Sequence, residues 1–250
     1  MCVGFPFDIS GIYSAGNGPA MRASILGVCF GENMNLLKEF IKVSTRLTHT
    51  DVKAEYASLA VALAAYLASI EEKIEPNKYL EKLKEILPEE AIEFTNLIEN
   101  VVFSCNNNDN SEIFAKSLGL EKGITGYIYH TVPLVIHCWL NNQQDYNKGI
   151  KEIIACGGDT DTTAAILGGI IGANVGVGKI DENLINNFFE YPRSIKWLRE
   201  LSLKLAKALD KENFEPQNEL EISILAIFIR NIFFTIVVLL HGFRRLLPPY

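Results

Sequence analysis

The stretch CGGDTDTTAAILGGIIGANVG, residues 156–176, constrains the fold more than any other part of the sequence. Its small residues recur every four positions and would form one nearly bare helix face: Ala164, Gly168, Gly172 and Gly176, with Ala165, Gly169 and Ala173 in the adjacent row. Each glycine inside a helix costs about 1 kcal/mol relative to alanine, so a close approach by the backbone of a neighbouring element has to compensate. Branched apolar side chains cover the rest of the helix. The pattern predicts a central, closely packed helix whose preceding loop is held rigidly.

Apolar residues recur at spacings of three and four along nearly the whole chain, and period-two alternation is scarce. This periodicity predicts an all-α fold. No linker of domain-joining length and no repeat interrupts it, so a single compact multi-helix domain over residues 1–250 is expected. The expected helices comprise residues 19–30, 35–47, 52–72, 76–86, 89–103, 111–118, 125–140, 145–155, 162–176, 192–209 and 219–246.

The acidic residues are scattered and give the chain a formal net charge of -7. We expect no nucleic-acid partner, because such partners bind strongly basic faces. Five cysteines lie far apart and form no CxxC pair, which favours a reducing compartment. The opening residues, MCVGFPFDIS, lack a basic segment followed by a long apolar run, as a secretion signal would have. A cytoplasmic location is therefore expected.

The segment ISILAIFIRNIFFTIVVLLHGF, residues 222–243, is long enough to raise the question of a membrane span. Arg230 and Asn231 lie within it, and a charged residue near the centre of a span costs about 2.5–3.5 kcal/mol on insertion scales. The segment therefore predicts a buried terminal helix and no membrane contact. The β-branched run 235–238 leaves a strand as an alternative.

The loop before the small-residue helix carries Asp159, Asp161 and Thr162 after two glycines. Two carboxylates and a hydroxyl are hard oxygen donors, which suit Mg²⁺ or Mn²⁺. The alternative is that one aspartate caps the helix and the other is a turn residue. The closely packed helix behind the loop favours the metal site, because a cap alone would not need so rigid a support.

A second glycine-bearing loop lies in GIYSAGNGPAMRASILG, residues 11–27, where Gly16, Asn17 and Gly18 precede Pro19. Such a turn leaves backbone N–H groups free at a helix start, where a diphosphate could bind. The alternative is an ordinary loop with a proline-started helix. His49 is either a hydrogen-bond donor to a ligand or a helix-end residue that satisfies nearby carbonyls. His130 and His137 lie on a mostly apolar stretch and are predicted to be core histidines, not ligands.

The segments GGDTDTTAAILGGIIGANVG, GNGPAMR and LTHTDVKAEYASLAVALAAYLAS together resemble the ADP-ribosylglycohydrolase family, which includes the glycohydrolase that reactivates dinitrogenase reductase. The resemblance implies an all-helical fold, two Mg²⁺ or Mn²⁺ ions, and hydrolysis of the bond between ADP-ribose and its acceptor. It also implies that Asp159, Asp161 and Thr162 bind metal, with the two aspartates at the catalytic centre. The residues implied to contact the substrate are Ser14, Gly16, Asn17, Gly18, Met21 and His49, with Arg22 beside them.

Active members of that family also carry a Thr-Asp-Asp cluster before the GNG loop, and this chain contains no Thr-Asp-Asp. The resemblance therefore implies an incomplete set of metal ligands. We expect either a hydrolase that needs a partner or self-association to complete the site, or a non-catalytic ADP-ribose-binding or scaffold protein. The sequence leaves the acceptor open: an arginine, a serine, another nucleophile or a free metabolite.

Overall fold

The computed structural model describes residues 10–210 and 218–246, and within them the chain is all-α, as predicted. Strand-like pairing in these residues is limited to three isolated bridges between loops: Ile12 with His49, Gly16 with Tyr127, and Ile124 with Gly158. The described residues form two compact units, one up to Ile180 and one from Asp181 onward. The expectation of one domain over residues 1–250 stays a prediction.

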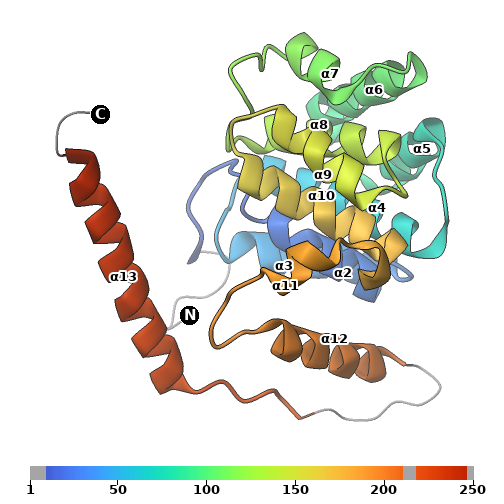
Figure 1. The fold of residues 1–250 in the computed structure, drawn as a ribbon. Helices are drawn as coiled ribbons and strands as arrows, with labels where there is room; N and C mark the ends of the chain where they lie inside the picture. Colours follow the sequence, from blue (N-terminus) through green and yellow to red (C-terminus); the bar gives the residue numbers. More distant parts are fainter. Residues whose placement is uncertain (1–9, 211–217, 247–250) are drawn as a thin grey trace. The chain divides into compact units, whose positions relative to one another are not determined.

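Most helices begin and end within a few residues of the predicted limits (Figure 1). The first unit contains η1 (Ala20–Arg22), α2 (Ala23–Phe30), α3 (Met34–Arg46), α4 (Val52–Ile70), α5 (Pro76–Ile86), η2 (Glu89–Ala91), α6 (Ile92–Asn106), α7 (Ser111–Ser117), α8 (Ile128–Asn141), α9 (Tyr146–Ala155), α10 (Thr160–Val175) and η3 (Val177–Lys179). The second contains α11 (Glu182–Asn186), α12 (Ile195–Leu209) and α13 (Ile224–Leu246). The short helix α11 was not predicted, because a single turn and a half shows no apolar periodicity.

The alanine-rich helix α4 forms the centre of the first unit and packs against α2, α3, α8 and α10. Small side chains let its neighbours come close: at Gly27 of α2, any side chain would collide with the carbonyl group of Ala62. Helix α8 is buried along most of its length, from Ile128 to Leu140. These contacts give the loops at the helix ends a rigid support.

Helix α10 lies between α4, α8 and α9, as the small-residue pattern predicted. Its buried residues are Thr163, Ile166, Leu167, Ile170 and Ile171. A Cβ at Gly168 would lie 2.9 Å from the Tyr146 hydroxyl oxygen, and one at Gly169 would lie 2.7 Å from Ser24 Oγ. A Cβ at Gly172 would have no atom within 4 Å. The expected backbone approach is therefore wrong at these positions: the atoms nearest the first two glycines belong to side chains, and none comes near the third.

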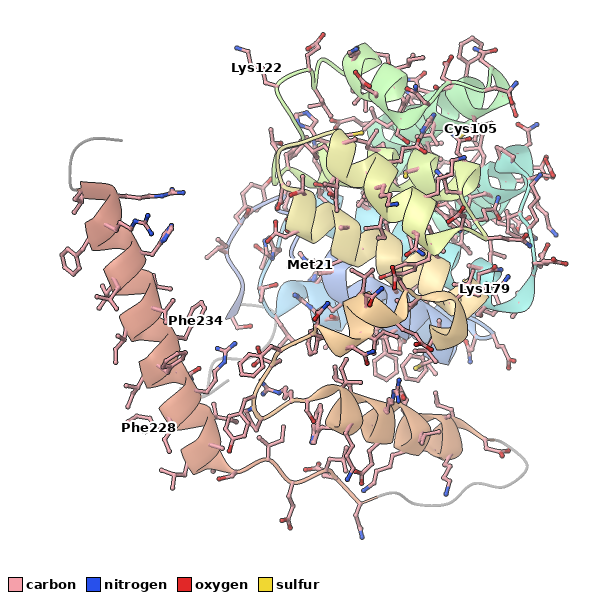
Figure 2. The ribbon with its side chains drawn as sticks, viewed as in Figure 1. Met21, Cys105, Lys122, Lys179, Phe228 and Phe234 are labelled. Carbon is pink, nitrogen blue, oxygen red and sulfur yellow. The ribbon has the colours of Figure 1, made fainter. Side chains whose placement is uncertain are left out.

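The expected burial of the C-terminal helix is wrong. Ala226 is the only buried residue of α13, and residues such as Phe228 and Phe234 are 61% and 54% exposed (Figure 2). The helix is long and apolar enough to cross a membrane by length and composition, with a mean hydropathy of 2.3. Arg230, on which the sequence argument rested, pairs with Glu190 through two nitrogens at 3.2 and 3.1 Å. Residues 235–238 are helical, so the strand alternative is also wrong. The absence of membrane contact stays a prediction.

Candidate functional site

The two glycine-bearing loops meet through a third segment, residues 123–128, which lies between them. On one side, Asn17 N–H donates to Gly126 O at 3.0 Å, and Ile128 N–H donates to Ala15 O at 2.9 Å. On the other side, Ile124 N–H donates to Gly157 O at 3.1 Å. These backbone hydrogen bonds join loops that are about 140 residues apart in sequence into one rigid group.

The glycines of the aspartate loop are required by the backbone. Gly157 and Gly158 have φ values of 71° and 78°, and Gly123 opposite them has 103°, a region that side chains disfavour. At Gly158 any side chain would also overlap the backbone of Ile124. The predicted glycine turn is therefore confirmed, and its tight fit fixes the direction in which the following aspartate leaves the loop.

Asp159 occupies the N-cap position of α10, but its side chain makes no capping hydrogen bond. Its Oδ2 instead accepts a hydrogen bond from Asn17 Nδ2 at 2.7 Å. Burial opposes ionisation of this carboxyl group, but hydrogen bonds from Asn17 and Thr162 outweigh it and lower the pKa of Asp159 below its ordinary value. The side chain of Asp161 lies against the same carboxylate. The Asp159 carboxylate thus faces the glycine loop, and the backbone N–H of Thr162 also helps to lower its pKa, so the choice between a metal ligand and a helix cap stays a prediction.

Asn17 is buried and connects three segments through one amide group. Besides Asp159, its Nδ2 donates to Thr131 Oγ1 of α8 at 3.0 Å. The Thr131 hydroxyl is fully buried and donates in turn to Thr125 O at 3.1 Å. Sequence reasoning placed Asn17 at the substrate and missed Thr131, since a threonine within an apolar helix carries no distinctive local signal. In the structure, the Asn17 side chain fixes the orientation of the Asp159 carboxylate.

The ring of His49 lies against the glycine loop. A Cβ at Gly16 would lie 2.8 Å from His49 Nε2, and one at Gly18 would lie 3.1 Å from its Cε1. Neither glycine has a positive φ, so the nearby His49 ring rather than the backbone conformation favours glycine at both positions. Among the described residues, no hydrogen bond uses the N–H of Gly16 or Gly18. The His49 ring therefore lies beside the glycine loop, while its backbone N–H donates to Thr45 O at 2.8 Å at the end of α3, and its role toward a ligand stays a prediction.

Hydrogen bonds from Arg22 link the glycine loop to the segment that carries His49. Its Nη1 donates to Gly18 O at 3.2 Å, and its Nη2 donates to Ser44 O and Thr48 Oγ1, each at 2.7 Å. Burial and then the positive charge of Arg22 lower the pKa of His49 below its ordinary value. Both effects disfavour the protonated imidazolium form of His49.

The two remaining predicted substrate contacts differ in setting. Ser14 is half-buried in the strand-like segment before Gly16, and its Oγ would lie 3.5 Å from a Cβ there. Met21 is 49% exposed on η1 (Figure 2). Ser14 and the His49 ring thus lie near the same glycine, and η1, which carries Met21, packs against α10.

The other histidines of the first unit lie outside the candidate site. His137 is fully buried, stacks on Phe114, and hydrogen bonds to Ser111 and Ser104, each at 3.2 Å. Burial lowers the pKa of His137 to about 4. The prediction of a satisfied core histidine is confirmed for His137. His130 is half-buried and hydrogen bonds to Thr125 at 2.9 Å.

The donors in the aspartate loop fit a hard divalent cation in kind but not in number. Asp159, Asp161 and Thr162 supply oxygens of the type that Mg²⁺ and Mn²⁺ prefer. Within residues 10–210 and 218–246, however, no three His, Cys, Asp or Glu side chains gather as a metal cage. Such a cation bound here would keep several water ligands or take donors from another polypeptide.

A sequence model of the ADP-ribosylglycohydrolase family matches residues 4–215. Because this is most of the 250-residue chain, the protein belongs to the ADP-ribosylglycohydrolase family. The fold and both glycine-bearing loops lie inside the matched region, whereas α13 lies beyond it.

Two relatives show how much of a family member the chain represents. An uncharacterized protein of Archaeoglobus fulgidus is 26% identical over 164 residues, which cover 66% of this chain and 51% of that protein. The ADP-ribosylhydrolase ARH3 of Bos taurus is 23% identical over an alignment of 199 residues, which covers 70% of this chain and 54% of that protein. The chain therefore spans about half the length of the curated relatives it matches.

Proposed function

We propose that this protein is an ADP-ribosyl hydrolase that cleaves the glycosidic bond at the anomeric carbon of ADP-ribose adducts with the help of Mg²⁺ or Mn²⁺. One observation carries the proposal: the glycine loop and the aspartate loop, which are remote in sequence, are joined by the Asn17–Asp159 hydrogen bond. Membership of the family and the similarity to the ADP-ribosylhydrolase of Bos taurus support it.

Each part of the candidate site has a role in this proposal. The free N–H groups of Gly16 and Gly18 and the neutral ring of His49 would donate hydrogen bonds to the diphosphate or ribose oxygens. Asp159, Asp161 and Thr162 would hold the cation, and Asn17 keeps the Asp159 carboxylate ionised and directed at the loop. Ser14 and Met21 would line the same ligand. The chemistry that a bound divalent cation supplies is acidification of water and neutralisation of developing negative charge.

The test is release of ADP-ribose from substrates modified on arginine, on serine and on a small-molecule acceptor, with Mg²⁺ or Mn²⁺ added to the full chain. Release that depends on the metal and is abolished in Asp161→Asn supports the proposal. A matched control is Asp145→Asn, which removes a carboxylate that caps α9 outside the site. Equal loss in both variants would contradict a catalytic role for the aspartate loop.

A non-catalytic ADP-ribose-binding protein is the second candidate, and the small number of metal donors favours it. Calorimetry separates the two functions. Binding of ADP-ribose without turnover at saturating Mn²⁺ supports the binding protein, whereas metal-dependent turnover by this chain contradicts it.

The missing donors could also come from a second polypeptide or from a second copy of the chain. In that case, adding a polypeptide that carries Thr-Asp-Asp raises both Mn²⁺ affinity and hydrolysis. An increase in neither quantity would contradict this form of the proposal.

A further inference from the structure

Arg22 is fixed by four hydrogen bonds, all of which it donates. Its Nε donates to Ser44 Oγ at 3.0 Å, and its two terminal nitrogens donate to Gly18 O, Ser44 O and Thr48 Oγ1. A guanidinium group has no acceptor, so the Thr48 hydroxyl oxygen must accept from Arg22. The planar fork of Arg22 holds that oxygen in one place.

The proton of the Thr48 hydroxyl then has two possible acceptors. Thr45 O lies 3.5 Å from Thr48 Oγ1, at the limit for a hydrogen bond, whereas His49 Nδ1 lies 2.9 Å away. The shorter contact favours donation from the hydroxyl to Nδ1. In a neutral imidazole one nitrogen accepts and the other carries the proton. Donation from Thr48 would therefore place the proton of His49 on Nε2.

The Nε2 atom is also the one that faces the glycine loop, because it would lie 2.8 Å from a Cβ at Gly16. Among the described residues, Nε2 has no hydrogen-bond partner. Its N–H group is thus available to an acceptor oxygen of a ligand seated on Gly16 and Gly18.

We propose that Arg22 and Thr48 are positioning residues that fix His49 in the Nε2–H tautomer, so that it presents a neutral donor to an acceptor oxygen of the ligand. The charge of Arg22 adds to this, because a nearby cation disfavours the protonated imidazolium. The donation to a ligand oxygen rests on the proposed ADP-ribose function. The tautomer of His49 does not, because it is a property of the ligand-free protein.

The experiment is ¹⁵N nuclear magnetic resonance of the histidine side chains in the ligand-free full chain, with the His49 signals assigned by their loss in His49→Gln. The wild-type spectrum should show a proton on Nε2 and a hydrogen-bonded acceptor at Nδ1. Thr48→Val should shift the Nδ1 resonance, Thr48→Ser should retain it, and Arg22→Met should shift it because Thr48 loses its fixed position. Thr95→Val is the matched control, since it removes a half-buried helical hydroxyl that donates to Ala91 O.

Calorimetry with ADP-ribose supplies the second readout. Thr48→Val should weaken ADP-ribose about fivefold, whereas Thr48→Ser and Thr95→Val should leave the affinity unchanged. A proton on Nδ1 in the wild type, or a Thr48→Val spectrum identical to the wild type, would overturn the inference. A wild-type protein that shows the expected tautomer but binds no ADP-ribose would support the positioning of His49 by Arg22 and Thr48 and contradict the proposed function.

Discussion

Replacing Asn17 with aspartate tests how the two loops are joined, because it changes one donor into an acceptor with almost no change of shape. Asn17 Nδ2 lies 2.7 Å from Asp159 Oδ2, so the variant would place a second carboxylate at that distance. The neighbouring Thr131 hydroxyl already donates to Thr125 O, so its proton could reach the new carboxylate only by breaking that bond. We expect Asn17→Asp to destabilise the first unit at neutral pH.

The magnitude follows from two contributions. Losing a hydrogen bond to a charged group costs about 1.5–3 kcal/mol. Repulsion between unit charges at 2.7 Å lies between about 1.5 kcal/mol in bulk water and about 6 kcal/mol at an effective dielectric constant of 20. Asp159 is only half-buried, and protonation of one carboxyl group limits the repulsion, so the lower values apply. We expect a total loss of about 3 kcal/mol in the free energy of unfolding.

Urea unfolding at pH 7 and pH 5, with and without Mn²⁺, measures this loss. The loss in the free energy of unfolding should be smaller at pH 5, because one of the two carboxyl groups then binds a proton. It should also be smaller when Mn²⁺ neutralises the pair of carboxylates. Asn100→Asp adds the same charge at an exposed position of α6 and serves as the control. If Asn17→Asp is destabilised no more than Asn100→Asp at pH 7, the argument that Asn17 donates to an ionised Asp159 is refuted.

Four further substitutions have expected outcomes that follow from the surroundings of single residues. Asp161→Asn should weaken Mn²⁺ binding in calorimetry about tenfold or more while circular dichroism shows unchanged helicity, since α10 is held by packing; a global loss of helical signal would favour a capping role instead. Gly18→Val should reduce ADP-ribose affinity at least about tenfold, because its side chain would displace the His49 ring; unaltered affinity in a folded Gly18→Val protein would count against the assignment. Gly172→Ala should instead raise the free energy of unfolding by about 0.5–1 kcal/mol, because the added methyl group meets no atom within 4 Å. His137 has a folded-state pKa of about 4, below the ordinary value near 6.5, so the unfolded chain binds an extra proton between these pH values. The free energy of unfolding should therefore fall by up to about 3 kcal/mol as the pH drops from 6.5 to 4. In urea titrations His137→Gln should reduce this pH dependence, and an unchanged dependence would show that His137 is not its source.

Local patterns in the sequence determined the helices and the chemical type of the site. Helix α5 begins at Pro76 and ends at Ile86, as predicted, because an apolar repeat and a proline at the first turn are both local signals. The glycine turn before Asp159 was likewise predicted, since only glycine adopts such φ values without strain. The family resemblance rested on the segment that contains this turn and on two other short segments, and the family match confirmed it.

Only the tertiary structure decided which residues meet. Thr131 contacts Asn17 across 114 positions of sequence, and no local pattern signals a hydroxyl that completes another residue's hydrogen bonding. Gly18 also leaves space for the His49 ring, which no local pattern could signal, because that ring comes from a different helix end. Helix α13 was expected to be buried from its apolar composition, and it is exposed along nearly its whole length. The apolar composition of a helix indicates how much free energy its burial would contribute, whereas its actual burial depends on whether other elements of the fold cover it.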